Sequence, residues 1–86
     1  SIPEIEKYQG NLKEGEYHGQ GTLFYPDGGR YEGEWLMGKK EGKGKIVYPP
    51  GSDIHFIEGG FENNVPIGVF RVVKSNGSEE THEFKK

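Results

Sequence analysis

Residues 31–53 read YEGEWLMGKKEGKGKIVYPPGSD, and residues 8–30 read YQGNLKEGEYHGQGTLFYPDGGR. The two stretches match with a constant shift of 23 residues, which aligns Tyr8 with Tyr31, Gly21 with Gly44 and Tyr25 with Tyr48. A fixed period of this length is typical of proteins in which one small supersecondary unit stacks on copies of itself. The sequence therefore predicts an internally repeated fold.

A third copy follows with a shift of 26 residues, so that Gly59 matches Gly33 and Phe61 matches Trp35. The three additional residues lie within the connection 52–56. We therefore expect one domain that is divided into a lead-in (1–7), a first repeat (8–30), a second repeat with a short insertion (31–56), a degenerate third repeat (57–77) and a C-terminal strand or tail (78–86).

Each copy is predicted to form a β-hairpin. In Tyr31–Leu36 the residues alternate, with Tyr31 and Trp35 on one face and Glu34 on the other. We expect a turn over Gly38–Gly42 and a return strand over Lys43–Tyr48. The register that we infer opposes Trp35 to Gly44, Gly33 to Ile46 and Glu34 to Lys45, because an aromatic ring can cover the backbone that a cross-strand glycine leaves bare.

The predicted fold class is all-β, an elongated antiparallel meander of about three hairpins in a single-layer twisted sheet. A further strand is expected at Thr81–Phe84. Of the 86 residues, fifteen are glycine and none is alanine, a composition that disfavours helices.

Composition also limits the function. The net charge of −3 differs from the basic character of nucleic-acid-binding proteins, and the chain contains no cysteine for disulfides or thiolate metal sites. We expect no enzymatic activity, no cofactor, no metal and no nucleic acid partner. Because small secreted domains usually need disulfides, we expect an intracellular protein, either cytoplasmic or associated with the cytoskeleton, with location in an organelle as the alternative.

Three sequence features resemble a nucleotide-binding, a metal-binding and a glycosylation site, but we expect each to have only a structural role. Residues 33–40 match most of a phosphate-binding loop, but Lys40 replaces the required Ser or Thr. The three histidines lack metal-ligand spacing; they are His18, His55 and His82. The glycosylation pattern at residues 76–78 coincides with the expected turn of the third repeat.

Two surfaces are candidates for binding. Alternation collects the apolar side chains on one face: Tyr8, Leu12, Leu23, Tyr25, Tyr31, Trp35, Ile46, Tyr48, Ile57, Phe61 and Phe70. We predict that the partner-binding residues on this face are Tyr8, Tyr25, Tyr31, Trp35, Tyr48 and Phe61, while packing of the rings on one another is the alternative. The second candidate is a basic cluster that could contact anionic lipids, formed by Lys39, Lys40, Lys43 and Lys45.

The repeat resembles the MORN family, whose pattern combines YxGxW with a later HGxGxxxYxDG. Residues 31–35 match the first part, and residues 18–21 with 25–28 match the second. This sequence departs from the pattern at Leu12 and Phe61 in place of Trp, at Glu41 and Ile67 in place of His, at Phe70 in place of Gly and at Lys74 in place of Tyr. The resemblance implies hairpin arrays that act mainly as protein-interaction scaffolds.

We therefore predict a non-catalytic module that binds a protein partner (a peptide, a helix or a domain) along its aromatic and glycine face. A peripheral membrane adaptor that uses the lysines is the first alternative. A small permanent subunit of a larger assembly is the second.

Overall fold

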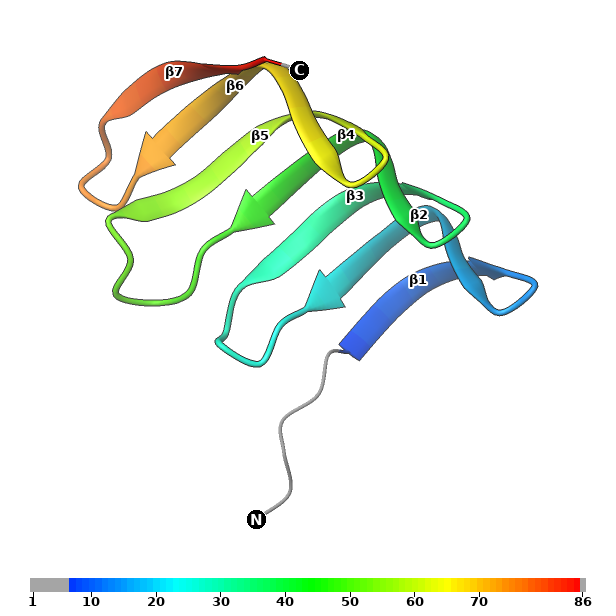
Figure 1. Ribbon diagram of the computed structural model, residues 1–86. Coiled ribbons are helices and arrows are strands. Elements are labelled where there is room, and N and C mark those ends of the chain that lie inside the picture. Colours follow the sequence, from blue (N-terminus) through cyan, green and yellow to red (C-terminus); the bar gives the residue numbers. More distant parts are fainter. Residues whose placement is uncertain (1–6, 86) are drawn as a thin grey trace.

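The computed structural model describes residues 7–85, which form seven strands in one antiparallel sheet (Figure 1). Each strand pairs with its neighbours in the chain, and the described residues contain no helix. The strands are β1 (Lys7–Lys13), β2 (Glu16–Phe24), β3 (Arg30–Leu36), β4 (Lys39–Val47), β5 (Ile54–Glu62), β6 (Val65–Lys74) and β7 (Glu79–Phe84). The all-β meander is confirmed, and the strand expected at Thr81–Phe84 is present as β7.

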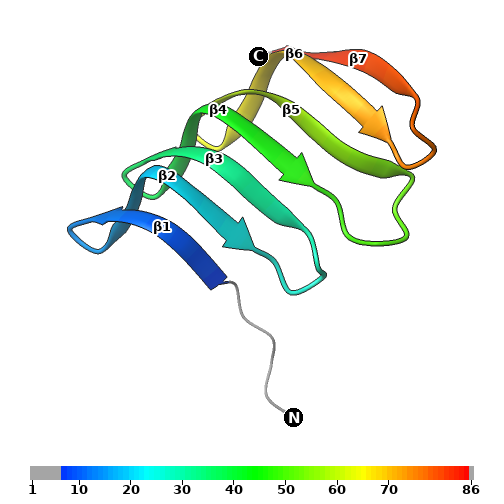
Figure 2. The ribbon, with the colours of Figure 1, turned by 180° about the vertical axis from the view of Figure 1, so that it is seen from behind.

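The sheet is a single layer. Its extents are 39 × 36 × 19 Å, and views from opposite sides show no segment of residues 7–85 lying across either face (Figures 1 and 2). Consecutive strands curve together, and connections between hairpins lie at one end of the sheet while hairpin turns lie at the other. Any apolar core must therefore form from side chains of the one sheet.

The turn of the second hairpin is shorter than predicted. The prediction placed it over Gly38–Gly42, but β4 already begins at Lys39, and only Met37 and Gly38 connect the strands. Both residues have positive φ, 51° and 83°, as in the two-residue turns whose twist matches that of the flanking strands. Asn63 and Asn64 form the corresponding turn between β5 and β6.

The predicted register of this hairpin is wrong. Gly33 pairs with Gly44 rather than with Ile46, and Trp35 pairs with Lys40. The short turn starts the pairing closer to the hairpin tip, and an irregularity between Gly33 and Trp35 then shifts it. Glu34 consequently does not pair with Lys45; its Oε1 accepts a hydrogen bond from the backbone N–H of Lys43 at 2.6 Å.

A row of directly paired glycines crosses β1 to β5, formed by Gly10, Gly21, Gly33, Gly44 and Gly59. Tyrosine rings rather than the tryptophan cover it as far as Gly44, and the Phe70 ring covers Gly59. A Cβ atom on Gly44 would lie 2.3 Å from the Tyr31 hydroxyl, and one on Gly21 would lie 2.0 Å from that of Tyr8. The predicted device, a ring over a cross-strand glycine, is present with a different ring.

The turns of the second and third hairpins are each hydrogen-bonded to the preceding hairpin. The Gly38 N–H donates to the Tyr17 carbonyl at 2.8 Å, and the Asn64 N–H donates to the Lys40 carbonyl at 3.0 Å. The residue that follows each of these carbonyls accepts a second hydrogen bond from the turn. Nδ1 of His18 accepts one from the Met37 N–H, and Oε1 of Glu41 accepts one from the Asn63 N–H. Glu41 therefore replaces the repeat histidine without loss of a hydrogen-bond acceptor.

Candidate functional site

Seven aromatic rings form an unbroken chain of contacts along one face of the sheet. This aromatic row consists of Tyr17, Tyr8, Trp35, Tyr31, Phe61, Phe70 and Phe84. Tyr8 and Tyr17 are stacked with centroids 3.8 Å apart, and the later contacts are edge-to-face at 4.9–5.8 Å. Edge-to-face pairs contribute about 0.5–1.5 kcal/mol each beyond the area that they bury. The row therefore links all the hairpins into one core.

The six predicted partner-binding residues divide into two groups by exposure. Tyr31 is completely buried, while Trp35 and Phe61 expose only 5% and 3% of their surface. Tyr8, Tyr25 and Tyr48 are half-buried and pack against this core from its margins. Tyr31, Trp35 and Phe61 thus have a packing role, as the alternative interpretation had it. A contact of any of the six residues with a partner stays a prediction.

Hydrogen bonds fix the polar ends of the rings. Trp35 Nε1 donates across the strand pair to the Gly21 carbonyl at 3.1 Å. The Tyr31 hydroxyl donates to the Glu34 carbonyl at 3.0 Å, and the Tyr8 hydroxyl donates to the equivalent carbonyl one repeat earlier, at Asn11. Burial, with the nearby Glu34 carboxylate, raises the pKa of Tyr31 to about 12. These hydrogen bonds hold the rings in fixed positions, and four rings of the row are buried in the core: Tyr31, Trp35, Phe61 and Phe70.

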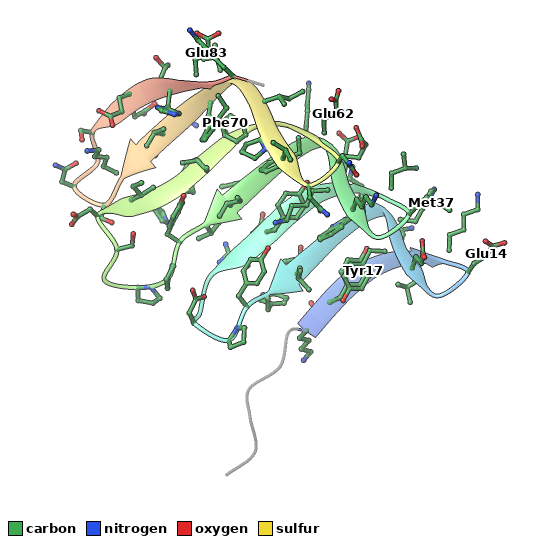
Figure 3. All side chains as sticks on the ribbon, in the orientation of Figure 1. Glu14, Tyr17, Met37, Glu62, Phe70 and Glu83 are labelled. Carbon is green, nitrogen blue, oxygen red and sulfur yellow. The ribbon has the colours of Figure 1, made fainter. Side chains whose placement is uncertain are left out.

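Sequence reasoning missed two members of the row. Leu12, which it placed on this face, pairs directly with Tyr17 of the row but is 61% exposed on the edge strand β1. Tyr17 stacks on Tyr8, and Phe84 of β7 closes the other end of the row against Phe70. Figure 3 labels Tyr17 and Phe70 near opposite ends of the row. The signal available was the odd-even position of Tyr17, which matches that of Leu23 in the same strand.

The four predicted lipid-binding lysines do not share one face. Lys40 points to the aromatic side, where its Nζ lies 5.2 Å from the Tyr31 ring centroid and 5.7 Å from that of Tyr25. Lys43 and Lys45 line a hollow on the opposite face, and Lys39 directly follows the turn. Adhesion of these lysines to a membrane stays a prediction.

The opposite face carries most of the charge of the sheet. We define this polar face by Glu32, Lys43, Lys45, Glu58 and Arg71, which surround an open hollow of about 670 Å³. The Arg71 guanidinium bridges Glu58 and Glu79 at 2.8 Å each, which joins β5, β6 and β7. Its hydrogen bond and charge lower the pKa of Glu79.

The motifs that resemble chemical sites occupy ordinary structural positions. Residues 33–40 run from β3 through the turn into β4, without the helix that a phosphate-binding loop precedes. No cluster of His, Asp and Glu within residues 7–85 has the grouping of a metal site. Asn76 accepts a hydrogen bond from the Ser78 N–H at 2.9 Å inside the final connecting turn. No helix in this part of the chain is long and apolar enough to cross a membrane.

Stacked hairpins, a paired glycine row and a continuous aromatic core define a β-hairpin repeat protein. The family model of the MORN repeat matches residues 8–30 and 31–53, more than half of the chain. The chain therefore belongs to the MORN repeat family. No curated protein shows significant similarity to it. The MORN repeat is a non-enzymatic interaction module that commonly contacts proteins or membranes.

Proposed function

We propose that this chain is a non-catalytic scaffold module that binds another protein along its aromatic and glycine face. The observation that supports this most is the aromatic row, which extends over a single-layer sheet while no segment of residues 7–85 covers it (Figures 1 and 3). Rigid aromatic side chains lose little conformational entropy on binding, and they are enriched where interfaces have most of their binding energy.

The half-buried tyrosines are the side chains that a partner reaches first. Tyr25 and Tyr48 occupy equivalent positions in successive repeats, 23 residues apart, at the margin of the core. The buried Trp35 and Tyr31 lie behind them and hold the surface rigid. Because equivalent tyrosines recur in successive repeats, the face suits an elongated partner, such as an extended peptide or a helix, that contacts more than one repeat.

Affinity purification with the immobilised chain, followed by mass spectrometry, would identify the partner, and the recombinant partner would then be titrated. Tyr25→Ser and Tyr48→Ser are expected to weaken its binding at least tenfold each. Glu16→Gln, at an exposed position of β2 outside the aromatic row, serves as the control and is expected to leave the affinity unchanged.

Circular dichroism of each variant keeps folding separate from binding. If both tyrosine variants stay folded and bind the partner like the unaltered chain, the aromatic face is not the interface. The membrane adaptor remains the second candidate, and pelleting with phosphatidylserine vesicles would test it. The intracellular location also stays a prediction, which immunofluorescence in the source cells would test.

A further inference from the structure

The polar face differs between the repeats at one position. The first two repeats have Asn11 and Glu34 where the third repeat has Gly60. In the second repeat the Glu34 carboxylate fills this place and accepts the Lys43 N–H at 2.6 Å. At Gly60 the place is open, because an added Cβ would meet only Ile67 atoms at 3.8 and 3.9 Å. The missing side chain leaves the backbone of β5 bare on this face.

The bare backbone forms the floor of the hollow. Gly44, Gly59 and Gly60 lie at its base, and the whole hollow measures about 670 Å³. The side chains around it come from β3 to β7: Glu32, Lys43, Lys45, Glu58, Val69, Arg71 and Thr81. It is open to solvent rather than enclosed, so it suits an extended chain laid across the sheet more than a small molecule that needs to be surrounded.

The positive charges in the hollow are unevenly neutralised. Arg71 has two carboxylate partners, Glu58 and Glu79. Within residues 7–85, Lys43 and Lys45 have no ion-pair partner, and the Lys45 ammonium lies over the Phe56 ring at 4.1 Å. Glu32, which pairs with Lys45 across the strands, is bonded to Arg30 instead. Two lysines are therefore free to bind carboxylates.

An apolar side chain completes the hollow. Val69 is 65% exposed, at the position where the first two repeats have Gln20 and Lys43. A valine beside bare glycine backbone offers an apolar contact at one side of the hollow, while the two lysines offer charge at the other. The third repeat thus combines two departures from the repeat pattern, Gly60 and Val69, on the same surface.

We propose that this hollow binds an extended acidic peptide segment of a protein partner. An apolar side chain of the segment lies over Gly60 against Val69, and carboxylates at alternate positions bind Lys43 and Lys45. Alternate side chains of an extended strand are about 6.6 Å apart, which is also the spacing of two lysines at alternate positions of β4. The hollow and the aromatic row lie on opposite faces, so this second interaction surface is independent of the proposed function.

The probe is a synthetic peptide, acetyl-SLSDSDS-amide, titrated into the 15N-labelled chain and followed by NMR at low salt. Its leucine and both aspartates lie on one side when it is extended. We expect amide shifts at residues 43–45, 59–60 and 69–71. The asparagine peptide SLSNSNS and the serine peptide SSSDSDS should each bind at least tenfold more weakly.

Variants test the same contacts from the protein side. Gly60→Glu restores the residue of the second repeat, fills the hollow and adds a like charge, so it should weaken peptide binding at least tenfold. Its fold should persist, because the position is open, and circular dichroism verifies this. Lys43→Gln and Lys45→Gln should each weaken binding several-fold. Lys39→Gln makes the same charge change in the same strand outside the hollow and should leave binding within twofold.

Three results would overturn the proposal. Amide shifts confined to the aromatic row would place the peptide on the other face. Equal affinity of folded Gly60→Glu and the unaltered chain would show that the hollow is not used. Pelleting with phosphatidylserine vesicles that depends on Lys43 and Lys45, without binding of the peptide, would assign these lysines to a lipid surface.

Discussion

Tyr31 lies against the backbone of Gly44, and the contact leaves no room for a side chain at the glycine. A Cβ atom there would lie 2.3 Å from the hydroxyl and 2.5 Å from a ring carbon. The ring packs on the strand rather than on a second layer, and this is how a single-layer sheet buries it completely. The energetic role of a glycine in this fold therefore depends on whether a ring covers it.

Two glycine substitutions separate these cases. Gly44→Ala should lower the free energy of unfolding by about 1–3 kcal/mol, as overpacking does, because the Tyr31 ring is itself enclosed. Gly60→Ala is the matched control: its Cβ meets nothing closer than 3.8 Å, and it should be neutral or stabilise by up to about 1 kcal/mol. Urea denaturation measures both. Equal stability of the two variants would contradict the ring-on-glycine packing.

Tyr31 also makes stability sensitive to alkali. Because its pKa in the folded state is raised to about 12 from an ordinary value of 10.0, the neutral phenol is favoured by folding. This contribution is complete below pH 10 and is lost as the pH rises through about 12. We expect the melting temperature to fall over that interval.

Melting curves by circular dichroism between pH 8 and about 12 would test the alkaline loss. Tyr31→Phe should melt lower at neutral pH, because it loses the hydrogen bond to the Glu34 carbonyl, but should show a flatter alkaline decline. Tyr48→Phe, a change in a half-buried ring, is the control. The same alkaline slope in Tyr31→Phe and the unaltered chain would remove Tyr31 as its source.

At the scale of the elements, the two-residue turns fix the hairpins. Met37 and Asn63 occupy the same turn position with φ of 51° and 52°, a conformation that asparagine tolerates and methionine does not favour. Met37 is also 53% exposed, at the hairpin end of the sheet (Figure 3). The second hairpin therefore has a better turn residue available to it.

Met37→Asn should stabilise the chain by about 0.5–2 kcal/mol, and Asn63→Met should destabilise it by a similar amount. Neither change removes the backbone N–H groups that bond to His18 and Glu41, so the pair isolates turn preference. Thermal unfolding at one pH gives both values. Stabilisation by Asn63→Met would show that contacts of the side chain outweigh turn geometry here.

In the third hairpin, the covering ring and the large side chain opposite it have changed strands relative to the second hairpin. At the positions of Tyr31 and Gly44 it has Ile57 and Phe70, and the Phe70 ring covers Gly59 from the opposite strand. The ring over the glycine row is therefore kept while the strand that supplies it changes. Phe70 is completely buried and contacts Phe61 and Phe84.

A double-mutant cycle tests this exchange. Phe70→Gly alone should cost about 3–5 kcal/mol through the cavity that it leaves, and Ile57→Tyr alone about 1–3 kcal/mol through overpacking. Together they recreate the arrangement of the second repeat, so the double variant should be more stable than the sum of the two effects by about 0.5–3 kcal/mol. Additive effects in denaturant titrations would mean that the third hairpin does not accept the exchanged ring.

At the scale of the whole molecule, periodicity was enough to predict the number and order of the strands and the face of their side chains, but not where β4 begins. Residues at equivalent positions of the repeats belong to the same strand of each hairpin, and alternation along a strand assigns each side chain to one face of the sheet. The pairing of Trp35 with Gly44 was wrong because the prediction assigned Gly38–Gly42 to the turn, whereas the turn contains only two residues and Gly42, with a φ of 98°, lies in the irregular part of β4.

The candidate surfaces were harder to predict than the fold. Alternation places Tyr31 and Tyr48 on one side but does not tell that the first is buried and the second half-buried, because coverage depends on neighbouring rings from other repeats. Alternation could have predicted that the four lysines lie on two faces, since Lys40 has an even number while Lys39, Lys43 and Lys45 have odd numbers. The hollow arises from a glycine and a valine that read as ordinary degeneration of the repeat.

The linear order of the strands makes the stability of the sheet a sum of neighbouring contacts, so its ends should open before its middle. At one end, β7 is exposed along most of its length; Phe84 packs on Phe70, and Arg71 and Lys74 pair with Glu79 and Glu80. We predict that amide hydrogen exchange is fastest in β7 and slowest in β3 to β5. Acid should increase the difference in exchange rate between β7 and the central strands.

The sign of the acid effect follows from Glu79. Arg71 holds the pKa of this carboxyl below its ordinary value in the folded sheet, so its contribution is present above that value and is lost as the pH falls through the folded pKa. Protection factors of β7 amides should therefore fall more than those of β3 between about pH 6 and pH 3. Glu79→Gln should lower β7 protection at pH 6 and reduce its further loss in acid. Uniform protection across the seven strands, unaffected by Glu79→Gln, would show that the sheet opens as one cooperative unit rather than from its edge.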